Sequence, residues 1–469
     1  MLERLKKRYI GDKAFYRMIF MIVIPIVVQN AITNFVSLLD NIMVGQVGTE
    51  QMSGVSIANQ LMFVYNLCIF GGYGGIGIFT AQFHGADDPE GIRYTVRLKM
   101  ILGVLLVGLA LVIFLLLDEP LIGLFLHDGS QTGDLALTLE AGRKYLRVML
   151  LGLLPFAVTQ VYTSTLREVG ETVLPMKAGI AAVLVNLFFN WLLIYGHWGF
   201  PELGVQGAAV ATVISRCVEC AVVVIWSHRH ETRFRFISGL WSSLRVPLTL
   251  TGSIARRGMP LLINETLWSL SVTMVNQCYS TRGLAVVAGM NIASTIVNLF
   301  NVIFLAMGNS VGIVVGKLLG RGDRQGAVDT DRKMIFFGFV SCIFIGFAMY
   351  LLAPLFPRLY NTTDEVRDLA VFMIRVAGVM MPFNSIVHAS YFTLRCGGKT
   401  MITFLFDCVF MCVVNLPLAY CLAHFTGLDI RPFYAICQSL DLLKAVLGIC
   451  LVRKGIWINN IVGKTMEST

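Results

Sequence analysis

Long apolar segments alternate with short polar connectors along the whole chain of 469 residues. A helix that crosses the roughly 30 Å hydrocarbon core of a bilayer needs about 20 apolar residues. Twelve segments meet this length, at residues 15–44, 53–82, 96–117, 140–165, 172–195, 205–227, 255–280, 289–315, 334–353, 368–394, 401–423 and 432–452. The pattern therefore predicts an all-α integral membrane protein with twelve transmembrane helices.

Several of these helices carry polar side chains on one face. In the first helix the polar positions follow steps of four, four and three residues, which keeps them on one side of a helix. A helix surrounded only by lipid does not tolerate such a stripe, so a shared polar cavity is expected. We assign to a substrate cavity the polar residues Gln29, Thr33, Ser37, Asn59, Asn66, Asn298 and Asn301. Trp268 is assigned to the same cavity as an apolar, aromatic contact.

Five acidic residues fall within the predicted helices: Asp40, Glu219, Glu265, Asp407 and Asp441. A charged carboxylate at the centre of a bilayer costs about 2.5–3.5 kcal/mol on insertion scales, so each needs a function or a partner. Asp40 continues the polar stripe of the first helix, and we predict that it binds a coupling ion, H⁺ or Na⁺. Glu265 and Asp407 are candidates for a second ion site.

The other two acids have a basic residue three positions away. Arg216 precedes Glu219, and Asp441 precedes Lys444. Because residues three apart are neighbours on a helix surface, we predict that each acid is neutralised by an ion pair within its own helix.

The chain also contains an internal repeat. Shifted by 235 residues, positions 25–91 match the second half at twelve identities, among them Pro25 with Pro260 and Gly85 with Gly320. A shift of 228 residues pairs Arg147 with Arg375. We predict two six-helix bundles, residues 1–230 and 255–469, joined by a cytoplasmic linker at 231–254. Since six is an even number, a pseudo-two-fold axis along the membrane normal relates the two bundles.

Charge distribution sets the expected orientation. The net charge is +9, and the segments on the side of the N-terminus hold 27 Lys and Arg while the opposite segments hold four. The positive-inside rule places both termini in the cytoplasm, so the excess charge needs no nucleic-acid partner. The eleven cysteines are scattered through apolar segments, and neither a phosphate loop nor an H-E-x-x-H motif is present. We expect no enzymatic activity, no cofactor and no metal other than a transported Na⁺.

Several short motifs occur in an order that resembles one family. They are Pro25-x-x-x-Gln29 followed by Asp40-x-x-x-x-Gly45, Gln82-x-x-Gly85-Ala86-Asp87, Leu166-Arg167, Asn186-x-x-x-Asn190, and Gly204-x-x-Gly207-Ala-Ala-x-Ala-Thr212. In this order and spacing the chain resembles the MATE family, the multidrug and toxic compound extrusion carriers, from about residue 15 to 455.

The resemblance implies export of amphipathic, often cationic, drugs and dyes in exchange for inward-moving H⁺ or Na⁺. It assigns the coupling-ion site to Asp40, Asn186, Asn190 and Thr212. Where some relatives place a second acid in the tenth helix, this chain has Asn384. A monomer in the bacterial inner membrane is expected, with lipid as its surroundings. The alternative function is a flippase for a lipid-linked glycan or another lipid, because such proteins share the plan of the wider superfamily.

Overall fold

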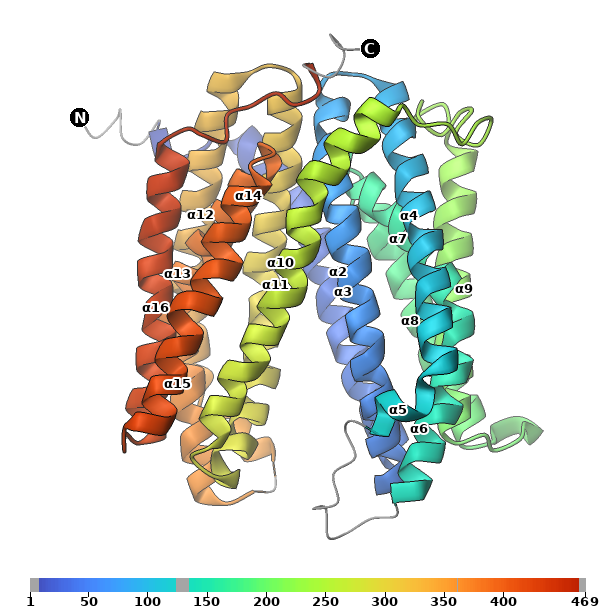
Figure 1. The fold of residues 1–469 in the computed structure, drawn as a ribbon, viewed down its shortest axis with the longest axis vertical. Helices are drawn as coiled ribbons and strands as arrows, with labels where there is room; N and C mark the ends of the chain where they lie inside the picture. The colour runs from blue at the N-terminus through green and yellow to red at the C-terminus, as the bar shows by residue number, and fades with distance from the viewer. Residues whose placement is uncertain (1–7, 124–134, 361, 464–469) are drawn as a thin grey trace. The chain divides into compact units, whose positions relative to one another are not determined.

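The computed structural model describes residues 8–123, 135–360 and 362–463. Inside the described helices, nothing is described of the side chains of residues 36–39, 41–42, 49–50 and 284, which include Ser37. Helices make up most of the described residues, which contain no β-strand (Figure 1). The prediction of an all-α membrane protein is confirmed.

Twelve long helical runs correspond one by one to the twelve predicted spans. The first six are α2 (Lys13–Gly45), α3 (Thr49–Gly85), α4 (Pro89–Leu116), α6 with α7 (Leu135–Met149 and Leu153–Glu168), α8 (Val173–Ile194) and α9 (Val205–Arg229). The last six are α10 (Leu248–Ser280), α11 (Leu284–Gly320), α12 (Arg324–Leu352), α13 (Asp364–Cys396), α14 with α15 (Thr400–Phe404 and Leu416–Phe425) and α16 (Ile430–Arg453). A short helix, α5 (Asp118–Gly123), follows α4.

The repeat seen in the sequence reappears in the helix boundaries. Helices α2 and α10 both have 33 residues and α3 and α11 both have 37, and the members of each pair start 235 residues apart. Among the described residues, eleven helical runs are long and apolar enough to cross a membrane. Helix α10 is long enough but not apolar enough to be one of these eleven, since it contains Asn264, Glu265 and Thr266 in succession.

The chain packs as two compact units, which we call the N-terminal and C-terminal units. The N-terminal unit comprises Val28–Thr80 and Pro89–Thr251, and the C-terminal unit comprises Met1–Val27, Ala81–Asp88 and Gly252–Thr469. The first part of α2 and the last turns of α3 thus pack with the C-terminal helices, a division that the sequence repeat does not indicate. Within the C-terminal unit, α2 begins and α16 ends at the same end (Figure 1).

The connector between α9 and α10 is fixed to the N-terminal unit. The Arg97 guanidinium of α4 donates to the carbonyls of Leu240 at 2.8 Å, Gly239 at 3.1 Å and Arg245 at 3.3 Å. Leu240 and Ile237 of the connector are buried. One arginine thus satisfies three backbone carbonyls of the connector. The predicted linker at 231–254 is shorter in the structure, because α10 already begins at Leu248.

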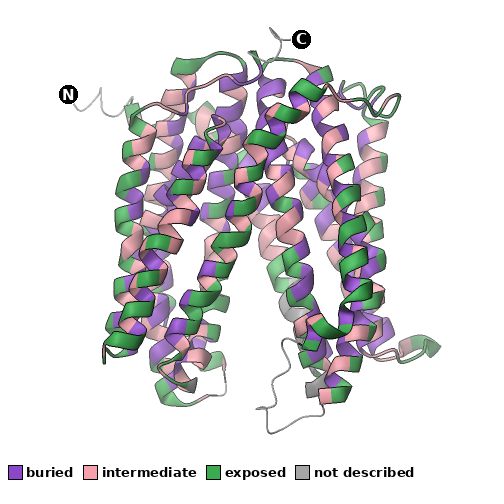
Figure 2. Ribbon diagram, viewed as in Figure 1, coloured by how far each residue is buried: buried purple, intermediate pink, exposed green. Residues whose placement is uncertain are grey.

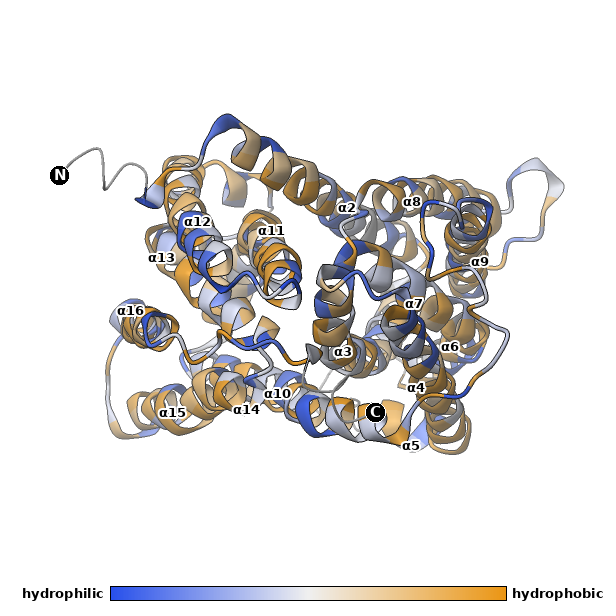
Figure 3. Ribbon diagram, turned by 90° about the horizontal axis from the view of Figure 1, so that it is seen from above, coloured by the Kyte–Doolittle hydropathy of each residue, from blue (hydrophilic) through white to orange (hydrophobic). Residues whose placement is uncertain are grey.

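Apolar side chains cover the outside of the helices. In α16, Leu443 and Val446 are exposed, whereas Phe433 and Cys437 are buried. Exposed and buried residues alternate along the long helices (Figure 2). Seen along the helices, α8, α9, α15 and α16 are mostly hydrophobic (Figure 3). Exposed leucine and valine on a long helix are expected where the neighbour is lipid rather than water.

Glycines allow α12 and α13 to pack closely in the C-terminal unit. A Cβ atom added to Gly378 would lie 2.7 Å from the Gly346 carbonyl oxygen, and one added to Gly346 would meet the Gly378 carbonyl oxygen. Small residues that let two backbones approach are typical of packed membrane helices.

Replacing Gly346 by alanine should therefore destabilise the protein by about 1–3 kcal/mol, as overpacking does in other tightly packed interiors. Gly108 in α4 is a matched control, because an added Cβ there meets nothing within 4 Å. Thermal unfolding of the purified protein, followed by tryptophan fluorescence, would measure both variants. Equal melting temperatures for Gly346→Ala and Gly108→Ala would contradict the close approach.

Charged side chains cluster around Asp118 at the end of α4 in the N-terminal unit. The Asp118 Oδ2 atom accepts from Arg143 Nε at 3.1 Å and Arg147 Nη2 at 3.0 Å, and Oδ1 accepts from the Glu119 N–H at 2.7 Å. Burial alone would raise the pKa of Asp118, but the bonds from Arg143, Glu119 and Arg147 outweigh it, so the pKa of Asp118 is lowered from its usual value.

This cluster predicts a stability loss in acid. A carboxyl group whose pKa is lowered by folding stabilises the protein above its unfolded pKa, about 3.9, and this contribution disappears as the pH falls through the folded pKa. We expect the melting temperature of the wild type to drop more steeply below about pH 4 than that of Asp118→Asn. Unfolding curves of both proteins between neutral and acidic pH would test this, and identical slopes would refute it.

Candidate functional site

Asp40 lies inside the N-terminal unit, where α2, α8 and α9 meet. Its Oδ1 atom accepts a hydrogen bond from Asn190 Nδ2 at 2.5 Å. Oriented with its amide nitrogen towards Asp40, Asn186 also approaches, with that nitrogen 2.9 and 3.3 Å from the two carboxylate oxygens. Thr212 Oγ1 lies 3.3 Å from the other end of the Asn186 amide. The structure therefore brings together all four residues assigned to the coupling-ion site.

Local sequence explains why these groups meet. Asn186 and Asn190 are four residues apart and share one face of α8. Helix α9 approaches that helix closely because it begins with small residues: a Cβ added to Gly207 would lie 2.5 Å from the Leu193 carbonyl oxygen. At the end of α2, the Tyr195 hydroxyl, which follows α8, donates to the Met43 carbonyl at 3.2 Å. These contacts hold Asp40 against the asparagines.

The chemistry of this site suits a small exchangeable cation. Among the described residues no Lys or Arg forms an ion pair with Asp40, which is bonded by neutral amides instead. Asn186 and Asn190 are 5% and 1% exposed, so bulk water does not solvate them freely. The Asn190 Oδ1 atom is buried without a hydrogen-bond partner. A carboxylate beside an unsatisfied amide oxygen offers the oxygen ligands that Na⁺ prefers, or a position for a proton.

The residues assigned to the substrate cavity are divided between the units. The N-terminal unit contains Gln29, Thr33, Ser37, Asn59 and Asn66, and the C-terminal unit contains Trp268, Asn298 and Asn301. Gln29 accepts from Arg167 Nη2 at 2.5 Å, and Asn59 accepts from the Tyr145 hydroxyl at 3.2 Å. Trp268 and Asn298 are exposed. A shared cavity for these residues stays a prediction, and the side chain of Ser37 lies outside the described residues.

Asp407 belongs to a separate cluster in the C-terminal unit. Its Oδ1 atom accepts from Lys444 Nζ at 2.6 Å, and Oδ2 accepts from Asn264 Nδ2 at 3.0 Å. Asp407 lies in the first of two π-helical turns, Leu405–Val409 and Met411–Asn415, which separate α14 from α15. Such turns widen a helix and re-aim its side chains, and they often occur at functional sites.

Glu265, the other candidate for a second ion site, bonds a different partner. Its Oε1 atom accepts from the Tyr391 hydroxyl at 3.2 Å. Asn264, next to Glu265 in the chain, contacts Asp407, so the two acids belong to neighbouring parts of one unit without bonding each other. Asp407 already holds a cation, the Lys444 ammonium, whereas no ion pair of Glu265 is found among the described residues.

The predicted ion pair within α16 is wrong. Lys444 pairs with Asp407 on another helical run instead of with Asp441. Arg216, predicted to pair with Glu219, donates to the Gly152 carbonyl at 3.4 Å and lies over the Phe156 ring at 4.9 Å. In both cases tertiary packing offers a partner that the three-residue spacing cannot reveal.

A buried lysine also escaped the sequence analysis. Lys99 of α4 is fully buried and donates to Glu168 at 2.6 Å and to Ser164 at 3.0 Å. In the sequence it counts among the basic residues that set the topology. Its position at the start of an apolar run was the available signal, since a lysine in that place needs a buried acid or must reach the interface.

Comparison with known proteins identifies the family. The MatE family model matches residues 25–192 and again residues 260–421. The chain belongs to the MATE family. A probable multidrug resistance protein NorM from Thermotoga maritima is 24% identical over 445 residues, covering 92% of this chain and 91% of the relative. A probable multidrug resistance protein YoeA from Bacillus subtilis is 22% identical over 418 residues, covering 88% of each.

Solved structures of MATE proteins share the fold. A mutant of the Vibrio cholerae MATE transporter VcmN superimposes with a TM-score of 0.85 at 19% identity, covering 95% of this chain and 98% of that one. An outward-facing multidrug resistance MATE transporter of the MOP superfamily gives 0.83 at 20% identity, covering 98% of both chains. This MATE protein is therefore a multi-pass membrane transporter and not an enzyme.

Proposed function

We propose that this MATE protein exports amphipathic, often cationic, drugs and toxic compounds by antiport with H⁺ or Na⁺. The observation that supports this most is the environment of Asp40, a carboxylate enclosed by Asn186 and Asn190 without an ion-pairing lysine or arginine among the described residues. A permanent salt bridge would occupy the carboxylate. Neutral amides leave its charge to be matched by an ion that comes and goes.

Asp407 supports the same assignment by contrast. Its two oxygens are occupied by Lys444 and Asn264. Because the Lys444 ammonium is covalently attached to the chain, it neutralises Asp407 without being transported. We therefore place ion coupling at Asp40 and treat Asp407 as a structural partner of Lys444. Glu265 remains our candidate for a second ion or for the positive group of a substrate.

In the proposed cycle, Asp40 takes up H⁺ or Na⁺ while its site is open to the outside. Neutralising the carboxylate changes the hydrogen bonds that Asn186 and Asn190 make, which favours release of the drug. The protein then converts to the inward-open state and releases the ion. Drug binding from the cytoplasm or the inner leaflet drives the return. Alternation of this kind needs each ligand to bind the two states with different affinities.

We also propose that the protein lies in the bacterial plasma membrane with both termini in the cytoplasm. Together with drug antiport, this predicts the outcome of one experiment. Everted membrane vesicles containing the protein should export a cationic dye from their medium into their lumen when a proton gradient or a sodium gradient is imposed. The two gradients are supplied separately, which identifies the ion. A lipid-linked glycan flippase would move no dye under either gradient, and that result would reject the proposal.

A further inference from the structure

A pocket in the C-terminal unit shares no lining residue with the cluster of Asp407, Lys444 and Asn264. It is lined by α10 and by the turn that leads from α13 into α14, and it has a volume of about 470 Å³. Its lining residues are Ser253, Arg256, Arg257, Pro260, Gly398, Lys399, Thr400, Met401 and Ile402. This volume falls within the range of about 300–1,000 Å³ that is common for sites of small ligands.

The charge of this pocket has one sign. Three of its nine lining residues are basic, namely Arg256, Arg257 and Lys399, and none is acidic. Arg256 and Lys399 are exposed and form no ion pair within the part of the chain that the structure describes. Arg257 lies beside the turn, since a Cβ atom added to Gly398 would be 3.5 Å from its Nη1 atom. The charges of Arg256 and Lys399 repel one another, and an anion in the pocket would relieve that repulsion.

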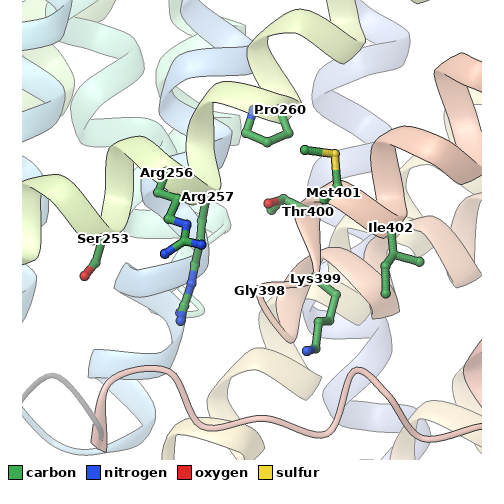
Figure 4. A pocket seen from close by; sticks show the side chains of 9 residues that line it. All are labelled: Ser253, Arg256, Arg257, Pro260, Gly398, Lys399, Thr400, Met401 and Ile402. Atoms are coloured by element: carbon green, nitrogen blue, oxygen red, sulfur yellow. The ribbon is translucent and has the colours of Figure 1, made fainter.

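The chemistry changes from one end of the pocket to the other. Figure 4 shows the Pro260 ring and Met401 at one end, and the two guanidinium groups and Lys399 towards the other. Near Pro260 in the sequence of α10, Met259 and Ile263 are 56% and 44% exposed. An apolar exposed surface on a membrane helix contacts acyl chains. A ligand that fits this pattern has an anionic head and a hydrocarbon tail.

We propose that this pocket binds the phosphate headgroup of an anionic phospholipid, with its acyl chains along the apolar surface of α10. Both lining segments belong to the side on which the basic connectors gather, 227–257 and 394–400. On the orientation proposed above, that side faces the cytoplasmic leaflet. Basic pockets between helices on that side are suited to phospholipid headgroups, and guanidinium groups bind phosphate with two parallel hydrogen bonds. The proposal does not depend on which drug or ion is transported.

The test measures lipid binding to the purified full-length protein by native mass spectrometry. The probes are phosphatidylglycerol, phosphatidylcholine and soluble glycerol 3-phosphate. The variant Arg256→Ala/Lys399→Ala removes two pocket charges. The control Arg324→Ala/Lys454→Ala removes two exposed basic residues that do not line the pocket. A third variant, Arg256→Lys/Lys399→Arg, keeps the charges and checks that loss of binding is not loss of folding.

We expect wild type to bind phosphatidylglycerol more tightly than phosphatidylcholine. Each basic residue near an anionic headgroup contributes about a fivefold effect, so the pocket variant should bind about 25-fold more weakly. The control and charge-preserving variants should bind within about twofold of wild type. Equal affinity for both lipids, equal weakening by the control, or unchanged binding in the pocket variant would each overturn the proposal. If glycerol 3-phosphate bound as tightly as phosphatidylglycerol, the proposed contact between the acyl chains and α10 would be overturned.

Discussion

The Asp40→Asn variant is expected to lose gradient-driven export completely while remaining folded. Asparagine has nearly the shape of aspartate and still offers an oxygen to Asn190 Nδ2, so the contacts among α2, α8 and α9 can be kept. It cannot hold a proton or match the charge of Na⁺. Dye export by everted vesicles should therefore fall to the level of vesicles without the protein, and the melting temperature should change little.

A matched control is available on the surface. Asp364 pairs with Arg367, and its side chain is 95% exposed. Asp364→Asn makes the same chemical change in water and should leave export unchanged, since exposed ion pairs contribute little to stability. Full gradient-driven export by Asp40→Asn would show that the ion is coupled elsewhere.

The second large effect concerns Lys444. Its side chain is 7% exposed, and that of Asp407 is 16% exposed. Removing one partner of a buried pair leaves an uncompensated charge and typically costs about 3–5 kcal/mol. We expect Lys444→Met to destabilise the protein by about this amount. Asp407→Asn/Lys444→Met removes both charges and should recover most of the loss. Thermal unfolding of the two variants and of wild type would measure the difference.

The same double variant separates structure from coupling. If Asp407 is only the partner of Lys444, the double variant should still export dye with the ion gradient. A double variant that is stable but uncoupled would instead place Asp407 in the transport mechanism. A single variant that is no less stable than the double variant would mean that the pair is not shielded from solvent.

Much of the fold could be predicted because membrane helices are specified by local composition. Each helix needs only a long apolar run, so twelve spans were found, with boundaries within ten residues of those in the structure. The largest difference is at the start of α12, because its first turns are polar. The repeat predicted matching halves, and α2 and α10 do have equal length. The way α2 divides after Val27 depends on contacts between distant segments, which a one-dimensional pattern does not contain.

The candidate sites show the same limit. Asp40 stands out in the sequence as an acid on a polar face, and the resemblance to the MATE family points to Asn186, Asn190 and Thr212. The partner of Lys444 could not be predicted, because spacing within α16 favours Asp441 while packing brings Asp407 closer. Two π-helical turns lie in that region, and they change which face of the helix Asp407 occupies.

Ion release on drug binding is the most direct test of the role of Asp40. The purified protein is titrated with a cationic dye in weakly buffered detergent solution, with and without sodium, while a pH indicator and a sodium electrode record the free ions. The account predicts that dye binding releases protons or sodium ions from wild type and from Asp364→Asn, and none from Asp40→Asn. Equal ion release by Asp40→Asn and wild type would contradict it.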